Sequence, residues 1–292
     1  MLKDNPLVTI VCSCFNHENY VLDSLNSILG QTYPAIQLII VDDFSRDRSK
    51  DVIEKWLIGH KEKEILFIKN SKNLGLNKSF NNAYQYVKGE FVMDFSADDI
   101  LFPEAIALLI FTFQNTTYEK CGIVFGNAKF YTIENSFERD YLPQNERPPT
   151  GHLAEAFQAN TFEFCSVSAL YKRDVYDQLN GYDEDLLYED LDFWLRATRL
   201  YQVDYTSEFI VKRQSAPTSM QSHFFRPLSK RTFLMNWCTF KIVKKAFKDN
   251  HLDSVLNRAL LKRVIFYRKR LKYNFLLKCQ YLILEHQIKG AI

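Results

Sequence analysis

The strongest indication of the fold lies in residues 90–103, which read Glu90-Phe91-Val92-Met93-Asp94-Phe95-Ser96-Ala97-Asp98-Asp99-Ile100-Leu101-Phe102-Pro103. Its apolar first half predicts a buried strand, and this strand ends at a small residue followed by two adjacent carboxylates. Pro103 and the apolar residues after it predict that a new helix begins there. Carboxylates at the end of a buried strand lose hydration and repel each other, so a positive partner is expected nearby.

Two interpretations of Asp98 and Asp99 follow from these residues alone. A hard cation such as Mg²⁺ or Mn²⁺ prefers oxygen ligands and often binds one or two protein carboxylates together with substrate phosphates. Alternatively, both residues cap the following helix, because Asp is favoured at helix N-termini. A motif this short does not decide between a metal site and a helix cap.

The chain before this stretch alternates strands with helices. Apolar strands are expected at 7–12, 36–41 and 65–68, and each is followed by residues with helical spacing, at 20–29, 52–57 and up to residue 86. This alternation predicts an α/β fold with a Rossmann-like, mainly parallel central sheet flanked by helices. Because ligands bind beyond the carboxyl ends of such strands, polar and aromatic residues that follow three of the strands should meet at one edge: Phe15, Asn16, Asp42, Asp43, Asp98 and Asp99.

The pattern changes after Gly122. A strand is expected at 123–125, a long irregular connection at 131–161, sheet-like structure at 161–171 and a turn at 181–184. An acidic cluster, Glu189, Asp190 and Asp192, then begins a helix. The cluster either complements the helix dipole or contains a general base. A general base must reach the proton that it removes and must have a suitable pKa. The residues alone leave both interpretations open.

Length and composition are typical of a folded globular protein. The 292 residues are 47% hydrophobic and 25% charged, with a net charge of +2. No apolar run approaches the roughly 20 residues of a membrane span, and the first residues lack the apolar core of a signal peptide. The six cysteines are scattered among apolar neighbours and form no zinc pattern, which predicts free thiols in a reducing compartment. We therefore expect a cytoplasmic protein.

Charge divides the chain into two parts. Residues 226–292 contain 16 lysines and arginines against 3 acidic residues, whereas residues 1–225 contain 21 against 32. We expect a catalytic domain at 1–225 and a basic, amphipathic helical extension at 226–292. The extension either packs on protein, in this chain or in a homo-oligomer, or attaches to an anionic membrane surface. Nucleic acid is not expected, because no nucleic-acid motif accompanies the charge.

The helices of the extension are expected to have one apolar and one basic side. The apolar side is expected to contain Val255, Leu256, Ala259, Leu260, Val264, Tyr267, Leu271, Phe275, Leu282 and Ile283. The wetter side is expected to contain Arg258, Lys262, Arg263, Arg268, Lys269, Arg270 and Lys272.

Residues 6–215 resemble the family-2 glycosyltransferases with the GT-A fold. The resemblance rests on six segments in the expected order, at 8–16, 29–34, 39–45, 73–75, 89–99 and 181–196. These are inverting enzymes that use nucleotide sugars to build bacterial polysaccharides and glycolipids. The resemblance implies a metal-dependent transfer of a hexosyl or N-acetylhexosaminyl group, with UDP as the expected nucleotide, to a hydroxyl of a saccharide or lipid-linked acceptor. Such an enzyme would be cytoplasmic and could act at the inner face of the membrane.

The resemblance also implies roles for particular residues. Asp42 would accept a hydrogen bond from the base beside Phe15, and Asp98 and Asp99 would hold Mn²⁺ or Mg²⁺ against the diphosphate. Asp190 would be the catalytic base, with Glu189 and Asp192 as alternatives. The residues expected to contact the nucleotide sugar are Cys14, Phe15, Asn16, Asp42, Lys78, Ser96 and Asp98.

Three positions depart from the family pattern. Ser96 replaces an Asp two residues before the metal ligand, Phe80 replaces an Arg and leaves Lys78 as the nearby cation, and Gln214 replaces a His, with His223 as a distant substitute. These departures keep one alternative open, a non-catalytic nucleotide-sugar-binding subunit of a polysaccharide assembly complex. A second alternative is a nucleotidyltransferase, which also uses carboxylates and a metal on a related fold, but the segment at Glu189 and Asp190 favours sugar transfer.

Overall fold

A computed structural model describes residues 5–61, 63–132, 136–143, 146–162, 164–215, 229–250, 253–271 and 275–292. The chain divides into two compact units. The first contains Met1–Gly151, Cys165–Tyr182 and Tyr201–Ser215, and the second contains His152–Phe164, Asp183–Leu200 and Ala216–Ile292. The boundary expected at 225/226, like His223, lies outside the described residues.

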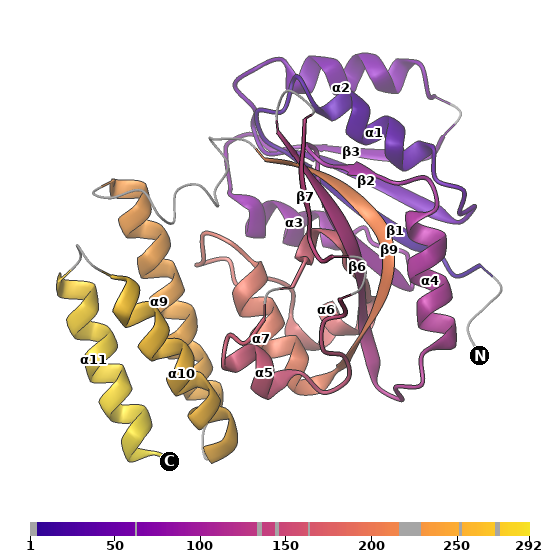
Figure 1. Ribbon diagram of the computed structural model, residues 1–292. Helices are drawn as coiled ribbons and strands as arrows, with labels where there is room; N and C mark the ends of the chain where they lie inside the picture. Colours follow the sequence, from indigo (N-terminus) through magenta and orange to yellow (C-terminus); the bar gives the residue numbers. More distant parts are fainter. Residues whose placement is uncertain are drawn as a thin grey trace. The chain divides into compact units, whose positions relative to one another are not determined.

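The first unit is built on a central sheet with the strand order β3-β2-β1-β4-β8-β6-β9-β5, and β7 pairs with β6. Its first part is parallel, as expected, and comprises β3 (Ile65–Lys69), β2 (Ile36–Asp42), β1 (Val8–Cys14) and β4 (Phe91–Ser96). Most residues of β1, β2 and β4 are buried. The α/β architecture with a parallel sheet portion is therefore confirmed (Figure 1).

The second part of the sheet is mixed. The short β8 (Leu170–Lys172) runs antiparallel to both β4 and β6 (Cys121–Thr132), and β6 pairs in parallel with β9 (Gln202–Ser215). The short β5 (Ile100–Leu101) is antiparallel to β9, and β7 (Phe137–Asp140) is antiparallel to β6. Strands β5 and β7 were not predicted from the sequence, because each is too short to show a periodic pattern.

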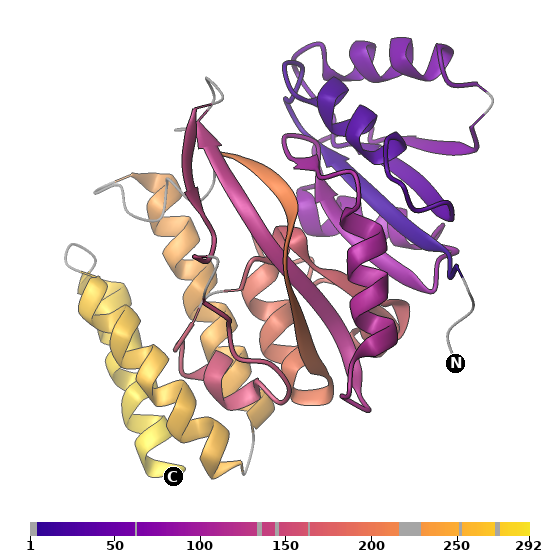
Figure 2. The same ribbon diagram turned by 45° about the vertical axis from the view of Figure 1, so that its right-hand side comes forward.

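Helices cover the sheet of the first unit. They are α1 (Val21–Leu29), α2 (Ser49–Ile58), α3 (Leu76–Tyr84), α4 (Ala105–Asn115) and α6 (Arg173–Leu179). The segment after α1 is hydrogen-bonded to the start of α4 through Gln31 and Thr32. Helix α3 lies on the other side of the parallel strands from α1 and α2 (Figures 1 and 2). Phe80 and Tyr84 of α3 form an aromatic cluster with Tyr176 of α6.

Two expectations for this region are wrong. The sheet-like structure expected at 161–171 is limited to β8, which a 3₁₀ turn at Ser166–Ser168 precedes, and α6 follows at once. The irregular connection expected at 131–161 contains β7 and the short α5 (Ala154–Gln158). Apolar residues alone do not separate a strand from a short buried helix, which explains the first error. Both β7 and α5 are too short to show a periodic pattern, which explains the second.

The second unit is helical. It contains α5, α7 (Asp190–Leu200), α9 (Lys230–Asn250), α10 (Ser254–Arg270) and α11 (Phe275–Gly290). The helices of the basic extension thus form one compact unit with α5 and α7, which lie earlier in the sequence. Trp194 of α7 stacks on Phe164 and lies near Phe157 of α5. Within the described residues, no helix is both long and apolar enough to cross a membrane.

The two sides expected for the extension need correction. Arg263 is buried rather than on the wetter side, and its guanidinium donates hydrogen bonds to the carbonyl oxygens of Phe157 and Gln158. Val255, Leu282 and Ile283 are exposed rather than buried. A helix that packs on several neighbours buries more than one stripe, so a single amphipathic pattern does not assign its faces.

Candidate functional site

The carboxyl ends of three neighbouring strands lie level in the first unit. Cys14 of β1 pairs in register with Asp42 of β2, and Ser13 pairs with Ser96, the last residue of β4. The thiol of Cys14 is buried, and burial raises its pKa to about 12, so it is neutral at physiological pH. The common edge expected from the sequence is present.

The loops after β1 and β2 are joined by hydrogen bonds. The amide of Asn16 donates to Oγ of Ser45 (2.9 Å), and Oδ1 of Asn16 accepts from the amide of Arg46 (2.8 Å). Asn16 adopts a left-handed conformation with φ of 60°, which Asn tolerates better than most residues. The two loops therefore form one surface at the edge of the sheet, with the half-exposed ring of Phe15 on it.

Asp42 has an unfilled acceptor. Its side chain is buried, and Oδ2 accepts a hydrogen bond from the amide of Ser45 (3.2 Å). Oδ1 is also buried but has no hydrogen-bond partner among the described residues. A buried acceptor without a partner costs free energy, so Oδ1 is poised to accept a donor from a ligand.

Asp43 has a structural role. Its carboxylate accepts hydrogen bonds from Nδ2 of Asn70 and from the amides of Leu74 and Gly75, all at 2.8–2.9 Å. Gly75 has φ of 84°, a conformation that glycine adopts without strain, and it directly precedes α3. Asp43 was expected at the ligand edge, but its oxygens are used to shape the loop before α3.

Asp98 and Asp99 lie in the turn between β4 and β5. Oγ of Ser96 donates to Oδ1 of Asp98, and Oδ1 of Asp99 accepts from the amide of Gln214 (3.2 Å). The following helix, α4, begins only after β5, and its N-cap residue, Glu104, makes no side-chain cap. The interpretation of Asp98 and Asp99 as helix caps is therefore wrong.

The electrostatics of this pair favour a cation. Burial raises the pKa of Asp99 well above its ordinary value, and the charge of Asp98 raises it further, whereas Arg213 and the amide of Gln214 oppose both effects. No group of three or more His, Cys, Asp or Glu side chains suited to a metal occurs in the described part of the chain. Two carboxylates fit a hard cation that takes its other ligands from phosphate and water.

Three residues of the first unit were not singled out from the sequence. Nε2 of His17 lies 3.9 Å from Oδ2 of Asp98. Phe44, which follows Asp42 at the end of β2 and Asp43 after it, is exposed and has φ of 61°. This conformation is uncommon for a bulky residue and often marks a functional site. The third is Asp94, and its mid-strand position gave no sequence signal except a charge inside an apolar run.

Asp94 belongs to a chain of hydroxyl groups. Oη of Tyr182 donates to Oδ2 of Asp94 (2.9 Å), and the hydroxyls of Tyr182 and Tyr176 lie 3.0 Å apart. Burial raises the pKa of Asp94 to about 7, although the hydrogen bond from Tyr182 lowers it. Asp94 is therefore a group of the first unit that titrates near neutral pH.

Three residues, Phe80, Lys78 and Gln214, lie at or near the positions that depart from the family pattern. Phe80 is fully buried and packs against Tyr182 with ring centroids 4.6 Å apart, so this position supplies no cation. Lys78 is exposed in the first turn of α3. The backbone amide of Gln214 donates a hydrogen bond to Oδ1 of Asp99. The side-chain Oε1 of Gln214 is buried without a partner in the described residues.

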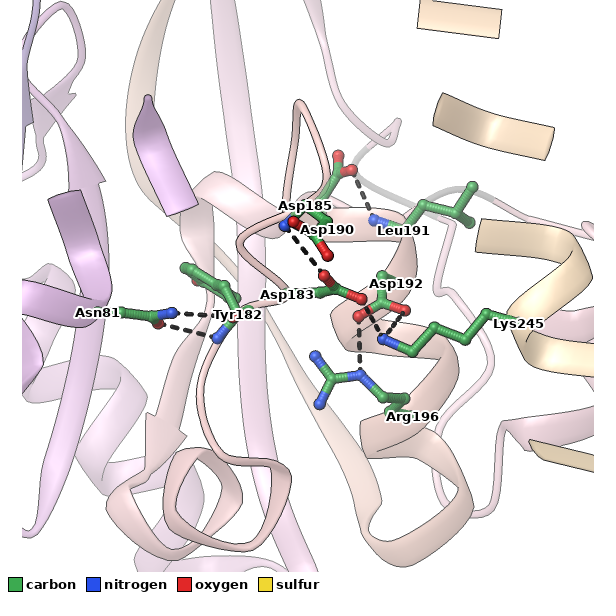
Figure 3. Close-up of polar contacts among 9 residues, drawn as sticks. All are labelled: Asn81, Tyr182, Asp183, Asp185, Asp190, Leu191, Asp192, Arg196 and Lys245. Carbon is green, nitrogen blue, oxygen red and sulfur yellow. Dashed lines mark hydrogen bonds and ion pairs between the residues drawn. The ribbon is translucent and has the colours of Figure 1, made fainter. Parts of the chain in front are cut away.

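Asp190 lies in the second unit and is the first residue of α7. Its Oδ1 accepts a hydrogen bond from the amide of Leu191 (2.6 Å), as Figure 3 shows. Asp192 is different, because its side chain is only 4% exposed and is paired with Arg196 (2.8 Å) and Lys245 (3.1 Å). Asp192 therefore serves an ion-pair network, and Asp190 is the more accessible carboxylate.

Comparisons with known proteins show a family and a fold. The sequence model described as glycosyl transferase family 2 matches residues 9–179. A protein of Methanocaldococcus jannaschii named as the uncharacterized glycosyltransferase MJ1057 is 28% identical over 215 residues, which cover 72% of this chain and 71% of that protein.

Solved structures share the fold at low sequence identity. Staphylococcus aureus TarS gives a TM-score of 0.68 with 17% identity, and the match covers 98% of this chain and 49% of TarS, so the chain spans about half the length of that protein. A shorter form, TarS 1–349, was solved in complex with UDP-GlcNAc. The mannosyltransferase PcManGT of Pyrobaculum calidifontis, solved with GDP-Man and Mn²⁺, gives 0.64 with 14% identity and covers 97% of this chain and 76% of its own.

Proposed function

Because the chain belongs to glycosyl transferase family 2, we propose that it is an inverting glycosyltransferase that moves a sugar from a UDP-linked donor to a hydroxyl of a saccharide or glycolipid acceptor. Its expected setting is the synthesis of bacterial surface polysaccharide. The single observation that carries the donor assignment is the buried, unpartnered Oδ1 of Asp42.

The geometry at Asp42 favours a particular class of base. Oδ2 already accepts from the amide of Ser45, so Oδ1 is left to accept from the ligand. Uracil and guanine each present a ring N–H donor, whereas adenine and cytosine present a ring acceptor at the equivalent edge. A carboxylate therefore selects uracil or guanine. Phe15 follows Cys14, the register partner of Asp42, and Phe44 follows Asp42 by two residues, so either exposed ring could stack on the base.

We assign the diphosphate to the turn after β4. Asp98 and Asp99 would hold Mn²⁺ or Mg²⁺, which when bound stabilises the negative charge of the leaving diphosphate. Ser96 orients Asp98 through its hydrogen bond. His17 lies close enough to Asp98 to contact the diphosphate oxygens at the same place. Lys78 supplies a further positive charge in the first unit.

We assign the general base to Asp190. It would remove the proton of the acceptor hydroxyl while that oxygen attacks the anomeric carbon from the face opposite the nucleotide. The pairing of both Asp192 oxygens with cations supports Asp190 over Asp192. Glu189 remains the alternative, since its side chain is also partly exposed.

The exposed charges of the second unit support a role at an anionic membrane surface. Arg258, Lys262, Lys269 and Arg270 of α10 are exposed. Deleting residues 226–292 would remove helices that share a compact unit with α5 and α7, so a charge substitution is the better test. Replacing these four residues by Gln should reduce sedimentation with phosphatidylglycerol vesicles, and unchanged sedimentation would contradict membrane attachment.

The test of the proposed function is calorimetry against UDP-GlcNAc, UDP-glucose, UDP-galactose and GDP-mannose, with Mn²⁺ and with EDTA. The tightest-binding donor is then incubated with acceptor saccharides while release of nucleoside diphosphate is measured. We expect binding of UDP-sugars, strengthened by Mn²⁺, and release of UDP. Binding to no donor, or binding without any release, would contradict the proposal.

A further inference from the structure

The segment that carries Asp190 is held by one helix of the basic extension. Residues 183–192 run from the turn after Tyr182 to the first turn of α7, and four residues on α9 contact them: Cys238, Thr239, Lys241 and Lys245. All of these residues belong to the second unit. They lie beyond residues 9–179, to which the family model extends.

Lys245 joins the two ends of this segment. Its Nζ lies 2.6 Å from Oδ2 of Asp183 and 3.1 Å from Oδ1 of Asp192, and Figure 3 shows its ammonium group between the two carboxylates. The other oxygen of Asp192 accepts from Nε of Arg196 at 2.8 Å. Asp190 lies between Asp183 and Asp192 in the sequence. Lys245 forms an ion pair with each of these two residues, so it holds the chain on both sides of Asp190.

The residues between these ends are also bound to α9. Nζ of Lys241 donates to the carbonyl oxygen of Asp185 (2.7 Å), and Sγ of Cys238 accepts from the amide of Leu187 (3.3 Å). The hydroxyls of Tyr188 and Thr239 lie 2.7 Å apart and are buried. A loop with this many fixed points has few alternative conformations.

The charges make Lys245 the critical contact. Asp192 is almost fully buried, and a buried carboxylate without a cation is strongly unfavourable. Burial alone would raise the pKa of Asp183, but the hydrogen bond from Lys245, the amide of Asp185 and the charges of Lys245 and Arg196 hold it below its ordinary value. Without Lys245, Asp192 would keep its ion pair with Arg196, but Oδ1 of Asp192 and Oδ2 of Asp183 would each lose the ammonium group that joins them, and the segment would shift.

We propose that Lys245 is a positioning residue for the transfer reaction, because it fixes the segment 183–192 in the conformation that presents Asp190 to the acceptor. This inference rests on the proposed function. A displacement of about 1 Å in a catalytic group can cost about a hundredfold in rate, so a contact that never touches substrate can control turnover. The C-terminal helices would then be part of the catalytic apparatus rather than only a membrane attachment.

The test compares Lys245→Met with Lys244→Met, which removes an equal charge from an exposed position on the same helix. We expect Lys245→Met to lower kcat for nucleoside diphosphate release by about 10-fold to 100-fold, while the donor Kd stays within about threefold. Amide hydrogen exchange should rise at 183–192 but not in β1, β2 and β4. Lys245→Arg should restore most of kcat, and Lys244→Met should match the wild type.

Several outcomes would overturn this inference. A kcat within threefold of wild type in Lys245→Met, or equal losses of kcat and donor affinity, would mean that Lys245 does not act through the segment. Tyr188→Phe, which removes a second contact with little change in shape, should give a smaller loss of kcat in the same direction. Turnover retained by Asp190→Asn would instead overturn the base assignment, so failure of the two proposals can be told apart.

Discussion

Oγ of Ser96 donates a hydrogen bond to Oδ1 of Asp98, two residues further along the turn that ends β4. The family pattern commonly has a carboxylate at this position, and here a neutral hydroxyl takes its place. A hydroxyl can orient Asp98 without adding to the repulsion between Asp98 and Asp99. The departure therefore removes one negative charge from the turn but orients Asp98, the residue that we propose as a metal ligand.

Removing this hydroxyl should weaken cation-assisted donor binding. In Ser96→Ala, Asp98 loses the hydrogen bond that orients it, which is worth about 1 kcal/mol or about a fivefold change in affinity. We expect the donor Kd measured by calorimetry in Mn²⁺ to rise by about that factor. In EDTA the variant and the wild type should agree, and an equal loss in both buffers would show that Ser96 contacts the donor itself.

Asp42→Asn should weaken donor binding more strongly. The amide has one acceptor where the carboxylate has two, so its NH₂ group must face either the amide of Ser45 or the N–H of the base. A mismatched buried pair costs about 1–3 kcal/mol, or roughly 5-fold to 150-fold in Kd. Calorimetry with UDP-GlcNAc measures the change.

The matched control for Asp42→Asn is Asp51→Asn, an exposed position in the first turn of α2. It removes the same charge from the same unit and should leave Kd unchanged. If both variants lose affinity equally, the effect is one of net charge. If neither does, the base is not read by Asp42.

Asp94 should make stability depend on pH. Its pKa in the folded protein is about 7, above the ordinary value of 3.8, so between about pH 4 and 7 the folded chain keeps a proton that the unfolded chain releases. Stability should therefore fall as pH rises through this window. Relative to Asp94→Asn, the wild type should lose on the order of 2 kcal/mol between pH 5 and pH 8.

Urea unfolding at these two pH values measures the Asp94 effect, and Asp51→Asn serves again as the control because it should keep the wild-type pH dependence. Parallel pH dependence of the wild type and Asp94→Asn would show that this carboxyl is ionised across the whole range. Tyr182→Phe should steepen the dependence, since the hydrogen bond from Tyr182 stabilises the ionised form.

The sequence predicted the parallel half of the sheet because β1, β2 and β4 are nearly continuous apolar runs. It also predicted that residues at their ends, such as Asp42 and Asp98, would share an edge. It did not predict β5, which separates Asp99 from α4 and rules out the capping interpretation. A strand of two residues is determined by its partner β9, and pairings between distant segments leave no local pattern.

Tertiary contacts also decide what single charged residues do. Asp43 looks like a ligand beside Asp42, but three donors from the loop before α3 occupy its oxygens. Arg263 looks like a surface residue, but two carbonyl oxygens at the end of α5 bind it inside the second unit. Lys245 looks like one of many basic residues in the extension, and only its ion pairs with Asp183 and Asp192 distinguish it.

We propose that this chain transfers a sugar with Asp190 as general base. The most direct test is the single-turnover rate of sugar transfer by Asp190→Asn, with Asp185→Asn, an exposed residue of the same segment, as the control. Loss of a general base should slow transfer by about 10²-fold to 10⁴-fold, while donor Kd and thermal unfolding remain those of the wild type and Asp185→Asn transfers normally. A transfer rate within tenfold of the wild type in Asp190→Asn would contradict the claim.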